Sequence, residues 1–385
     1  MIGHMDTFVL TEYGVEANSS DLQTAKIQKV LDMCKENGGK VVFKTGSYRF
    51  SGLKIWSNTA IYLEKNTKLI GSENCDDYPL FELPENMKLY TDKQAFTPGP
   101  EEYRRAMFTA YAETNIKIIG EENTVIDGMN CFDENGEENY RGPHGIFFSN
   151  CSNILFEGYT ITNCGNFMHQ LDKCENVVMK NITALAGHDG VHLHCCENFV
   201  IESCKMLTGD DCIAGVNIRN LKVRNCELNS SCNIFRIGGC NIDISETTMC
   251  GPGYYPHRLT IVKGRNECLP RESGRHNTLS VIDYFSTDKL GESMIGENIA
   301  MRNCKIKNID ALLLFDKSAR WSSGAPLRYI TFENVTAEGL KKPSRIRADK
   351  DCRLTVHMKN VVASFDEDSG SPDLFDAENV SVIYE

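Results

Sequence analysis

The sequence predicts an all-β fold, a parallel β-helix with coils of about 22 residues that is closed at its N-terminal end by an α-helix. Three observations predict it: short alternating apolar segments, an asparagine that recurs ahead of them, and one amphipathic segment that precedes them all. Segments of three to six residues are too short for a helical repeat, which needs about 33 residues or more. Alternation with period 2, rich in Ile, Val and Phe, indicates strands. Each coil then buries its apolar face by stacking on its neighbours.

The N-terminal helix is predicted over "SDLQTAKIQKVLDMCKENGG", residues 20–39. Ser20 or Asp21 is expected to cap it, and the pair Gly38–Gly39 ends it. Its apolar residues share one face: Leu22, Ile27, Val30, Leu31 and Cys34. A solenoid exposes its first coil, so a capping element is expected there. No low-complexity linker divides the chain, and residues 1–385 are predicted to form a single domain after a tag-like or disordered start at 1–7.

The repeat is carried by "CSNILFEGYTITNC" (151–164), "CENVVMKNITAL" (174–185) and "CENFVIESCKML" (196–207), with further copies along the chain. The asparagines fall at 153, 176, 198, 220 and 241, in steps of 23, 22, 22 and 21 residues. This spacing predicts a ladder of side-chain amides that bond from coil to coil. Cys151, Cys174 and Cys196 recur in the same way, which predicts a vertical stack of buried thiols.

Composition excludes several classes of partner. The net charge of −12 argues against nucleic acid or an anionic membrane as partner, and no apolar run approaches the ~18 residues of a membrane span. Seventeen cysteines without a scaffold spacing favour a reduced cytoplasm. The opening "MIGHMDTF" has no apolar run of the signal type, but "GHM" looks like a tag remnant. The alternative is therefore a secreted protein whose signal was removed. The oligomeric state stays open.

Three stretches resemble a known family: residues 13–79, "TVIDGMN" (124–130) and "LTGDDCIA" (207–214). They are similar to bacterial polygalacturonase-type enzymes of glycoside hydrolase family 28, and the resemblance spans about residues 8–245. It implies a single-stranded right-handed parallel β-helix of the pectin-lyase-like type. It also implies an inverting glycosidase that acts on pectic and related uronate-containing chains.

The motifs of that family map unevenly onto this sequence. Its Asn-Thr-Asp falls on Gly187–Asp189, where the aspartate alone is kept, and its Gly-Asp-Asp is intact as Gly209–Asp211. Its Gly-His-Gly falls on Ser231–Asn233, where Cys232 replaces the histidine, and its Arg-Ile-Lys is matched only by Lys263 and Arg265 in "TIVKGR". The resemblance implies that Asp210 is the general acid, while Asp189 and Asp211 hold and deprotonate the attacking water.

The residues themselves indicate the same chemistry. Glycoside hydrolysis needs a protonated acid and a carboxylate. A gap of 21 residues in a coil of about 22 predicts that Asp189 and Asp210 lie almost above one another. Asp211 joins them if Gly209 permits a bulge. Three carboxylates this close cannot all ionise, so at least one pKa is raised, which supplies an acid near neutral pH. The alternative is an Asp-Asp turn or a cation site.

The stretch "HDGVHLHCC" contributes His188, His192 and His194. One of them is expected to stand in for the missing histidine and to bind substrate; the alternatives are plain packing histidines, or zinc held with Cys195, Cys212 or Cys232. No spacing matches a closed zinc motif, so no metal and no cofactor are predicted. Substrate binding is also predicted for four basic residues, because a guanidinium fork suits a sugar carboxylate: Arg236, Arg258, Lys263 and Arg265. A solvated basic loop is the alternative for those beyond residue 250.

The predicted function is an inverting glycoside hydrolase with a three-aspartate mechanism and a uronate-containing oligosaccharide or polysaccharide as substrate. A cytoplasmic location favours exo-action on imported fragments. Two alternatives stay open, because a β-helix serves many functions. One is a polysaccharide lyase that works by β-elimination, and the other is a non-catalytic glycan-binding β-helix.

Overall fold

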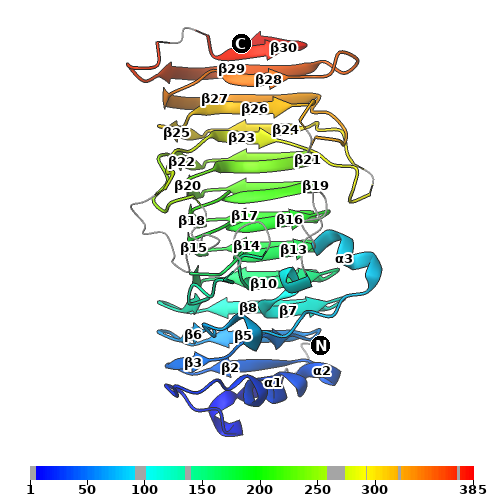
Figure 1. Ribbon diagram of the computed structural model, residues 1–385, viewed down its shortest axis with the longest axis vertical. Coiled ribbons are helices and arrows are strands. Elements are labelled where there is room, and N and C mark those ends of the chain that lie inside the picture. Colours follow the sequence, from blue (N-terminus) through cyan, green and yellow to red (C-terminus); the bar gives the residue numbers. More distant parts are fainter. Residues whose placement is uncertain are drawn as a thin grey trace.

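The structure is a computed structural model that describes residues 6–91, 101–134, 140–257, 274–291, 293–319, 322–370 and 373–385. Its strands stack in one long column, with the N-terminal helices at one end and the last strands at the other (Figure 1). All strand pairs are parallel, and each strand pairs with the strand one coil further along. The predicted all-β parallel β-helix is therefore confirmed. No helix in the described part of the chain is long and apolar enough to span a membrane.

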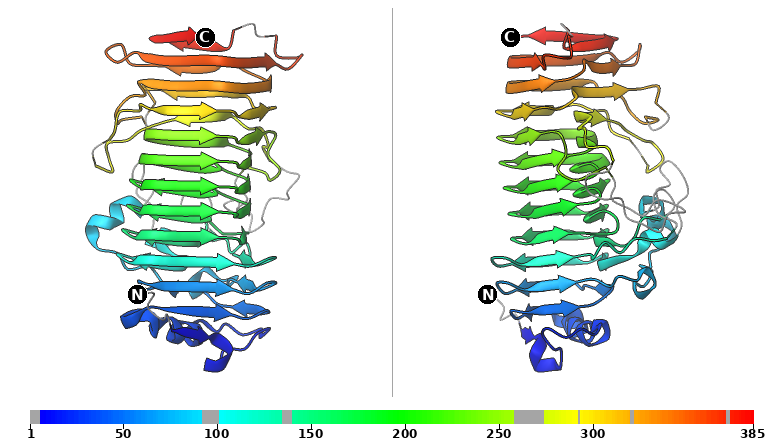
Figure 2. Two further views of the ribbon diagram at one scale, coloured as in Figure 1. Left: turned by 180° about the vertical axis from the view of Figure 1, so that it is seen from behind. Right: turned by 60° about the vertical axis from the view of Figure 1, so that its left-hand side comes forward.

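The register divides the strands into three sheets, which run the length of the column (Figure 2). Sheet 1 consists of β4 (Leu53–Lys54), β7 (Ala106–Tyr111), β10 (His144–Ser149), β13 (His169–Asp172), β16 (Val191–His194), the first part of β19 (Ile213–Arg224), the first part of β21 (Asn233–Ser245), β23 (Ser280–Tyr284), β26 (Ala311–Asp316), β28 (Ser344–Arg347) and β30 (Phe375–Glu378).

Sheet 2 consists of β1 (Thr7–Val9), β2 (Gly39–Phe43), β5 (Thr59–Leu63), β8 (Thr114–Gly120), β11 (Ser152–Glu157), β14 (Glu175–Lys180), β17 (Glu197–Glu202), the second parts of β19 and β21, β24 (Ile299–Arg302), the first parts of β27 (Tyr329–Leu340) and β29 (Leu354–Phe365), and β31 (Val380–Tyr384). Sheet 3 consists of β3 (Ser47–Arg49), β6 (Lys68–Ile70), β9 (Val125–Asp127), β12 (Thr160–Thr162), β15 (Thr183–Ala186), β18 (Lys205–Thr208), β20 (Glu227–Ser230), β22 (Thr248–Cys250), β25 (Lys305–Lys307) and the second parts of β27 and β29.

The N-terminal cap is shorter than predicted. The helix expected over 20–39 is α1 (Thr24–Asp32) followed by α2 (Cys34–Asn37). Neither Ser20 nor Asp21 caps it, and Leu22 is exposed rather than on the buried face. The reason is Gln23, whose side chain bonds the backbone of Glu16 while its N–H donates to the carbonyl of Arg49. These bonds hold the preceding residues outside the helix.

The repeated residues stack as the period predicts. Side-chain amides bond from coil to coil in the turn before sheet 2, with nitrogen–oxygen distances of 3.2, 2.8, 3.1 and 2.9 Å along Asn176, Asn198, Asn220, Asn241 and Asn298. Each adopts a left-handed φ between 54° and 58°, which asparagine tolerates better than most residues. Asn153 instead donates to Thr114. The amide ladder is thus confirmed from Asn176 onward.

The cysteine stack is confirmed as well. The strands that follow Cys151, Cys174 and Cys196 pair in register, and all three thiols are buried in the apolar interior. All cysteines in the described part of the chain are free thiols. They act here as small core residues.

An insertion between β6 and β7 covers part of the outer face of sheet 1. It contains α3 (Glu85–Thr91) and two short 3₁₀ turns, Cys75–Asp77 and Glu101–Arg104. Figure 1 shows α3 beside the middle coils. A second apolar cluster, separate from the interior, joins Phe81, Leu83 and Met87 of this insertion to outward-facing residues of sheet 1 such as Phe147 and Val216. The outer face of sheet 1 is therefore walled on one side, and the candidate site lies beside that wall.

Candidate active site

The three predicted aspartates lie in the turns that lead from sheet 3 into sheet 1. Asp189 lies between β15 and β16, and Asp210 and Asp211 lie one coil further along, between β18 and β19. One carboxylate oxygen from each residue lies within 4.8 Å of one oxygen from both others. Their exposed fractions are only 3%, 4% and 3%. The structure thus brings the three carboxylates together in one buried cluster.

The stacking within this cluster differs from the prediction. Strands β16 and β19 pair with a step of 22 residues, so Asp189 lies in the column of Asp211, and His188 lies in the column of Asp210. The backbone N–H of Asp211 donates to Oδ1 of Asp189 at 3.1 Å. The prediction that Asp189 and Asp210 are vertical neighbours is therefore wrong by one residue. Asp210 reaches the cluster from the adjacent column.

Gly209 has a different role from the expected bulge. It lies in the turn outside β18 and β19. A Cβ on this residue would lie 2.4 Å from the carbonyl oxygens of both Gly187 and Pro256. Glycine is required because two backbone segments approach it closely. That approach brings the segment before residue 258 against the aspartates.

Two cationic or ionisable side chains that sequence analysis missed face Asp210. Nη1 of Arg141 lies 3.6 Å from Oδ2 of Asp210, and Nε2 of His257 lies 3.6 Å from its Oδ1. Nη1 of Arg141 is also 3.3 Å from Nδ1 of His188. The exposed fraction of Arg141 is 2%, which is rare for an arginine without a charge partner. These contacts offset the negative charge of the cluster.

Asp211 is held by a chain of neutral donors. Its Oδ1 accepts hydrogen bonds from the backbone N–H of Asn233 at 3.0 Å and from Nδ2 of the same residue at 2.9 Å. Oδ1 of Asn233 accepts in turn from the hydroxyl of Ser280 at 2.8 Å. Asn233 lies 22 residues after Asp211, so the coil spacing is the signal that identifies it as a site residue.

Burial and mutual repulsion raise the pKa of these carboxyl groups. The pKa of Asp189 is raised well above its ordinary value, chiefly by burial and then by Asp210 and Asp211. Burial and Asp210 raise the pKa of Asp211 to about 6, although Arg236 and the bonds from Asn233 oppose the shift. The cluster therefore retains a proton close to neutral pH, as an acid catalyst requires.

The predicted histidines occupy two different places. His188 is fully buried beside Arg141. His192 lies on the outer face of sheet 1, where its Nδ1 is 2.6 Å from Oδ2 of Asp189. His194 is one step further along β16 and approaches His192, with 3.0 Å between their Nε2 atoms. His192 is thus the predicted histidine that makes direct contact with the aspartates.

Of the predicted basic residues, Arg236 is placed on the same face. It lies two coils along the column from His192, through β19 and β21. Its Nε is 3.7 Å from Oδ2 of Asp283, and its guanidinium lies 4.3 Å from the ring centre of Phe285. Arg258, Lys263 and Arg265 lie outside the described residues.

Two sets of side chains offer three ligand atoms within 4.8 Å among the residues that the structure describes: the aspartate cluster, and Asp210 with Cys232 and His257. The alternative zinc site on the three histidines is not among these sets. Cys212, one of its suggested ligands, is fully buried and contacts the hydroxyl of Thr208. Asp, Cys and His together suit zinc chemically, but no cofactor or metal is needed for the chemistry argued below.

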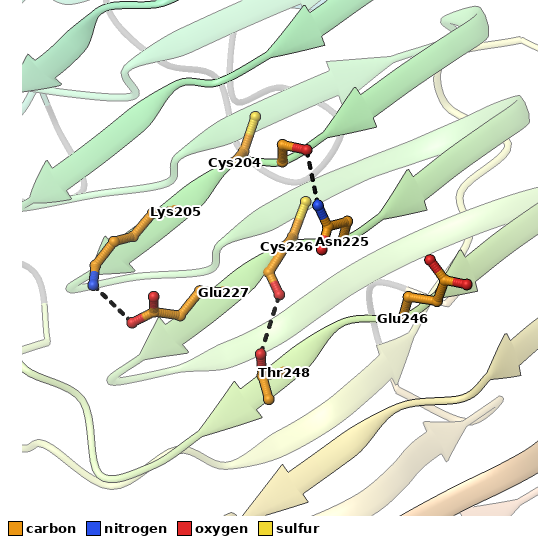
Figure 3. Close-up of a pocket in the computed structure, with 8 residues that line it drawn as sticks. Cys204, Lys205, Asn225, Cys226, Glu227, Glu246 and Thr248 are labelled. Atoms are coloured by element: carbon orange, nitrogen blue, oxygen red, sulfur yellow. Dashed lines mark hydrogen bonds and ion pairs between the residues drawn. The ribbon is translucent and has the colours of Figure 1, made fainter.

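A shallow groove elsewhere on the molecule has a different character (Figure 3). Its volume is about 320 Å³, and it lies along the turns that join sheets 2 and 3. Its lining includes the exposed ion pair of Lys205 and Glu227, at 2.8 Å, and Asn225, which donates to Ser203. No aspartate of the cluster lines it. The convergent acids thus lie at sheet 1, not at this groove.

Comparison with known proteins agrees with the fold and with this site. Residues 84–245 match the model of the family described as glycosyl hydrolases family 28. A curated exo-poly-alpha-D-galacturonosidase of Dickeya chrysanthemi is 31% identical over 70 residues, which is 18% of this chain and 12% of that protein. The matched family segment contains all three aspartates.

Solved structures show the same β-helix. The family 28 exopolygalacturonase of Yersinia enterocolitica has a TM-score of 0.65 at 16% identity, over 99% of this chain and 78% of that one. A hyperthermoactive exopolygalacturonase of Thermotoga maritima has a TM-score of 0.69 at 14% identity, over 98% and 91%. The surface adhesin PfbA of Streptococcus pneumoniae also matches, with a TM-score of 0.60 at 12% identity, over 97% and 93%. At these identities the likeness shows the fold alone.

The fold and the site together define the class of protein, a glycosidase built on a parallel β-helix. The resemblance to glycoside hydrolase family 28 is confirmed by the segment that carries the aspartate cluster.

Proposed function

We propose that this protein hydrolyses glycosidic bonds of uronate-containing, pectin-type oligosaccharides by acid–base catalysis. The observation that carries the proposal is the cluster of three buried carboxyl groups with oxygens within 4.8 Å. Clustered, buried carboxyl groups with raised pKa values are the arrangement that keeps one of them protonated at the working pH. A purely structural role is a poor explanation, because buried like charges destabilise the fold.

The roles are divided between the two columns. Asp210 is the general acid, as the family resemblance implies, and Asp189 and Asp211 share the attacking water. When Asp210 loses its proton to the leaving oxygen, Arg141 and His257, both at 3.6 Å, stabilise the carboxylate that remains. Asn233 holds Asp211 in place, and His192 holds Asp189.

The stereochemical outcome is proposed to be inversion. Inverting enzymes usually separate their carboxyl groups by ~6.5–9.5 Å to leave room for water, whereas the nearest oxygens here lie within 4.8 Å. The water must then sit against the sugar ring beside Asp189 and Asp211 rather than between acid and base. Proton NMR of the first-formed product separates the two outcomes. The opposite anomeric configuration is expected, and a retained configuration would instead make Asp189 or Asp211 a nucleophile.

The substrate class rests on charge and on the curated relative. Arg141 and Arg236 place two guanidinium groups near an acidic cluster, and a guanidinium suits a sugar carboxylate. The Dickeya chrysanthemi relative is named as an exo-poly-alpha-D-galacturonosidase. We therefore propose removal of units from the ends of galacturonide-type oligosaccharides, in the cytoplasm, with carbohydrate rather than nucleic acid or membrane as partner.

The test is a panel of galacturonides and rhamnogalacturonan fragments, assayed with the wild type and with Asp210→Asn. Activity should fall by about 10²–10⁴-fold in this variant, as expected for loss of a general acid. Asp243→Asn is the matched control, because Asp243 pairs with Arg302 on sheet 2, away from the cluster. An ultraviolet-absorbing unsaturated product would show a lyase. Ligand binding without turnover in the wild type would show a glycan-binding protein.

A further inference from the structure

A continuous chain of hydrogen bonds leads from the candidate base into the protein. Asp189 Oδ2 lies 2.6 Å from Nδ1 of His192, Nε2 of His192 lies 3.0 Å from Nε2 of His194, and Nδ1 of His194 lies 3.1 Å from Oδ1 of Asp172. Both histidines and Asp172 lie on the outer face of sheet 1, in β16 and β13. The hydrolytic scheme above gives His194 and Asp172 no role.

The chain is shielded from solvent along its whole length. The exposed side-chain fractions are 4% for Asp189, 14% for His192, 12% for His194 and 0% for Asp172. Phe167 stacks on the ring of His192, with centres 4.3 Å apart and planes 5° from parallel. Gln170 donates to the same oxygen of Asp172. The second oxygen of Asp172 is buried and without a hydrogen-bond partner among the described residues.

Counting hydrogens shows that this chain holds an extra proton. A neutral imidazole carries one N–H and a carboxylate carries none. Two neutral histidines and two carboxylates therefore supply two hydrogens for three hydrogen bonds. If both histidines donated through Nδ1 to their aspartates, the two Nε2 atoms would face each other as acceptors at 3.0 Å. One further proton satisfies all three bonds and leaves the chain with a single negative charge.

That proton has two equivalent ends. With Asp189 protonated, each hydrogen bond donates in the direction of Asp172. With Asp172 protonated, each donates in the direction of Asp189. Moving each hydrogen across its own bond converts one state into the other, and no side chain needs to turn. Both end states satisfy every bond of the chain.

The surroundings favour a proton on the carboxyl groups over an imidazolium. Burial lowers the pKa of His192, and His194, Arg236 and His144 add to the effect, while Asp210 opposes it. Burial also raises the pKa of Asp172. The charged groups that face the chain come from four elements: Arg141, His144 on β10, Asp210 and Asp211 between β18 and β19, and Arg236 on β21.

We propose that Asp189, His192, His194 and Asp172 form a proton wire, which moves the proton that the base takes from the attacking water onto Asp172. The inference rests on the proposed hydrolase function and deepens it. It makes His192, His194 and Asp172 positioning and proton-transfer residues. It also assigns to β16 the task that the family histidine, absent at Cys232, leaves open.

The step balances as follows. The water oxygen forms a bond to the anomeric carbon while the bond to the leaving oxygen breaks, and Asp210 gives that oxygen its proton. The proton lost by water goes to Asp189, and one shift along the three hydrogen bonds places a proton on Asp172. Asp189 is then a carboxylate again. After the product leaves, the proton returns along the same bonds to solvent in the open site, and Asp210 takes a proton from solvent.

One test needs no activity. In the full chain labelled with ¹⁵N at histidine, the wild type should show a strongly downfield, exchange-protected proton attached to a ring Nε2 and shared by His192 and His194. Asp172→Asn removes the acid that completes the chain and should abolish that signal. His357→Gln, on β29 and in contact with Glu385, is the control that should leave it unchanged. Independent titration of His192 and His194 near their ordinary pKa in the wild type would overturn the proposal.

The second test follows turnover on the substrate that the panel identifies. In Asp172→Asn and in His194→Gln, kcat should fall by about ten- to a hundredfold at unchanged KM, less than the about 10²–10⁴-fold expected for loss of the base itself. In mixtures of light and heavy water, the wild-type kcat should follow a curved dependence because several protons move together, and both variants should give straight lines. Straight lines in the wild type, or full activity in both variants, would overturn the wire. A wild type that turns over no substrate but shows the shared proton refutes the hydrolase function and leaves the hydrogen-bonded chain supported.

Discussion

Two columns of side chains in this molecule obey the same stacking rule and differ in every other respect. In the turn before sheet 2, neutral amides stack from Asn176 to Asn298, and each donor meets an acceptor one coil away. In the turn before sheet 1, Asp189 and Asp211 stack with the same step, and their like charges repel. The coil decides which residues meet. The chemistry of the side chains decides whether the meeting stabilises the fold or stores a proton.

The comparison also explains why the repelling column persists. Each aspartate of the cluster accepts from a backbone N–H one coil along, Asp189 from Asp211 and Asp211 from Asn233. These bonds resemble the amide ladder in direction and spacing. Such donors partly offset the cost of burying a carboxylate. The site is therefore a modified ladder in which function has replaced complementarity.

The largest effect is expected from making this column resemble the ladder. Asp211→Asn retains an oxygen to accept from Asn233, but it removes a carboxylate that holds the water. We expect kcat/KM to fall by about 10²–10⁴-fold, measured on the same galacturonide panel. Activity within tenfold of the wild type would show that Asp189 alone serves as base.

The same substitution should stabilise the protein. Folding raises the pKa of Asp211 from 3.8 to about 6, so the folded state binds this proton more tightly than the unfolded state. Its stability is therefore fully present below about pH 4 and is lost as pH rises through about 6. The loss is about 3 kcal/mol for a shift of about two pH units.

Urea unfolding of the wild type and Asp211→Asn at pH 4 and pH 7 measures this difference. The variant should be more stable by about 3 kcal/mol at pH 7, and the two proteins should converge at pH 4. Equal stability at both values would show that the carboxyl group titrates normally. The result would quantify how much stability the site gives up for function, as expected for active sites.

Breaking the ladder should have the opposite signature. Asn220→Ala loses bonds to Asn198 and Asn241 and forces a β-carbon residue into a φ of 58°. We expect a loss of about 2 kcal/mol, combining αL strain of about 1 kcal/mol with weak exposed hydrogen bonds. Activity should be unchanged. Asn220→Gly, which accepts that φ, should lose less, and an equal loss in both variants would show that the amide bonds alone matter.

The repeat made most of this fold predictable. Alternation and the recurring asparagine report the same period many times, so no single error changes the conclusion. The register at the site was missed by one residue because the two motifs, Gly187–Asp189 and Gly209–Asp211, are matched by position within the family rather than by coil. The strand register counts 22 residues and places Asp189 with Asp211. A turn outside the strands hides that difference in the sequence.

The residues around Asp210 were beyond prediction for a different reason. Arg141 precedes its partner His188 by 47 residues, and His257 comes from the segment between β22 and β23. Neither lies at the repeat spacing, so no local pattern links them to the cluster. Contacts made by insertions depend on tertiary packing, which a period cannot report. His192 was accessible because it lies on a strand of the repeat.

The smallest effect concerns Cys232, which stands where the family histidine would lie. Its thiol is 3.5 Å from Nδ2 of Asn233, and burial together with Asp211 and Asp210 raises its pKa well above the ordinary value. It is therefore a neutral, weak hydrogen-bonding group. Cys232→Ser should lower kcat/KM by less than about tenfold, equivalent to about 1.4 kcal/mol, while His192→Gln should cost more because His192 contacts Asp189 directly. If Cys232→Ser were the more damaging of the two, the task of the family histidine would belong to the column of Asp210 and not to strand β16.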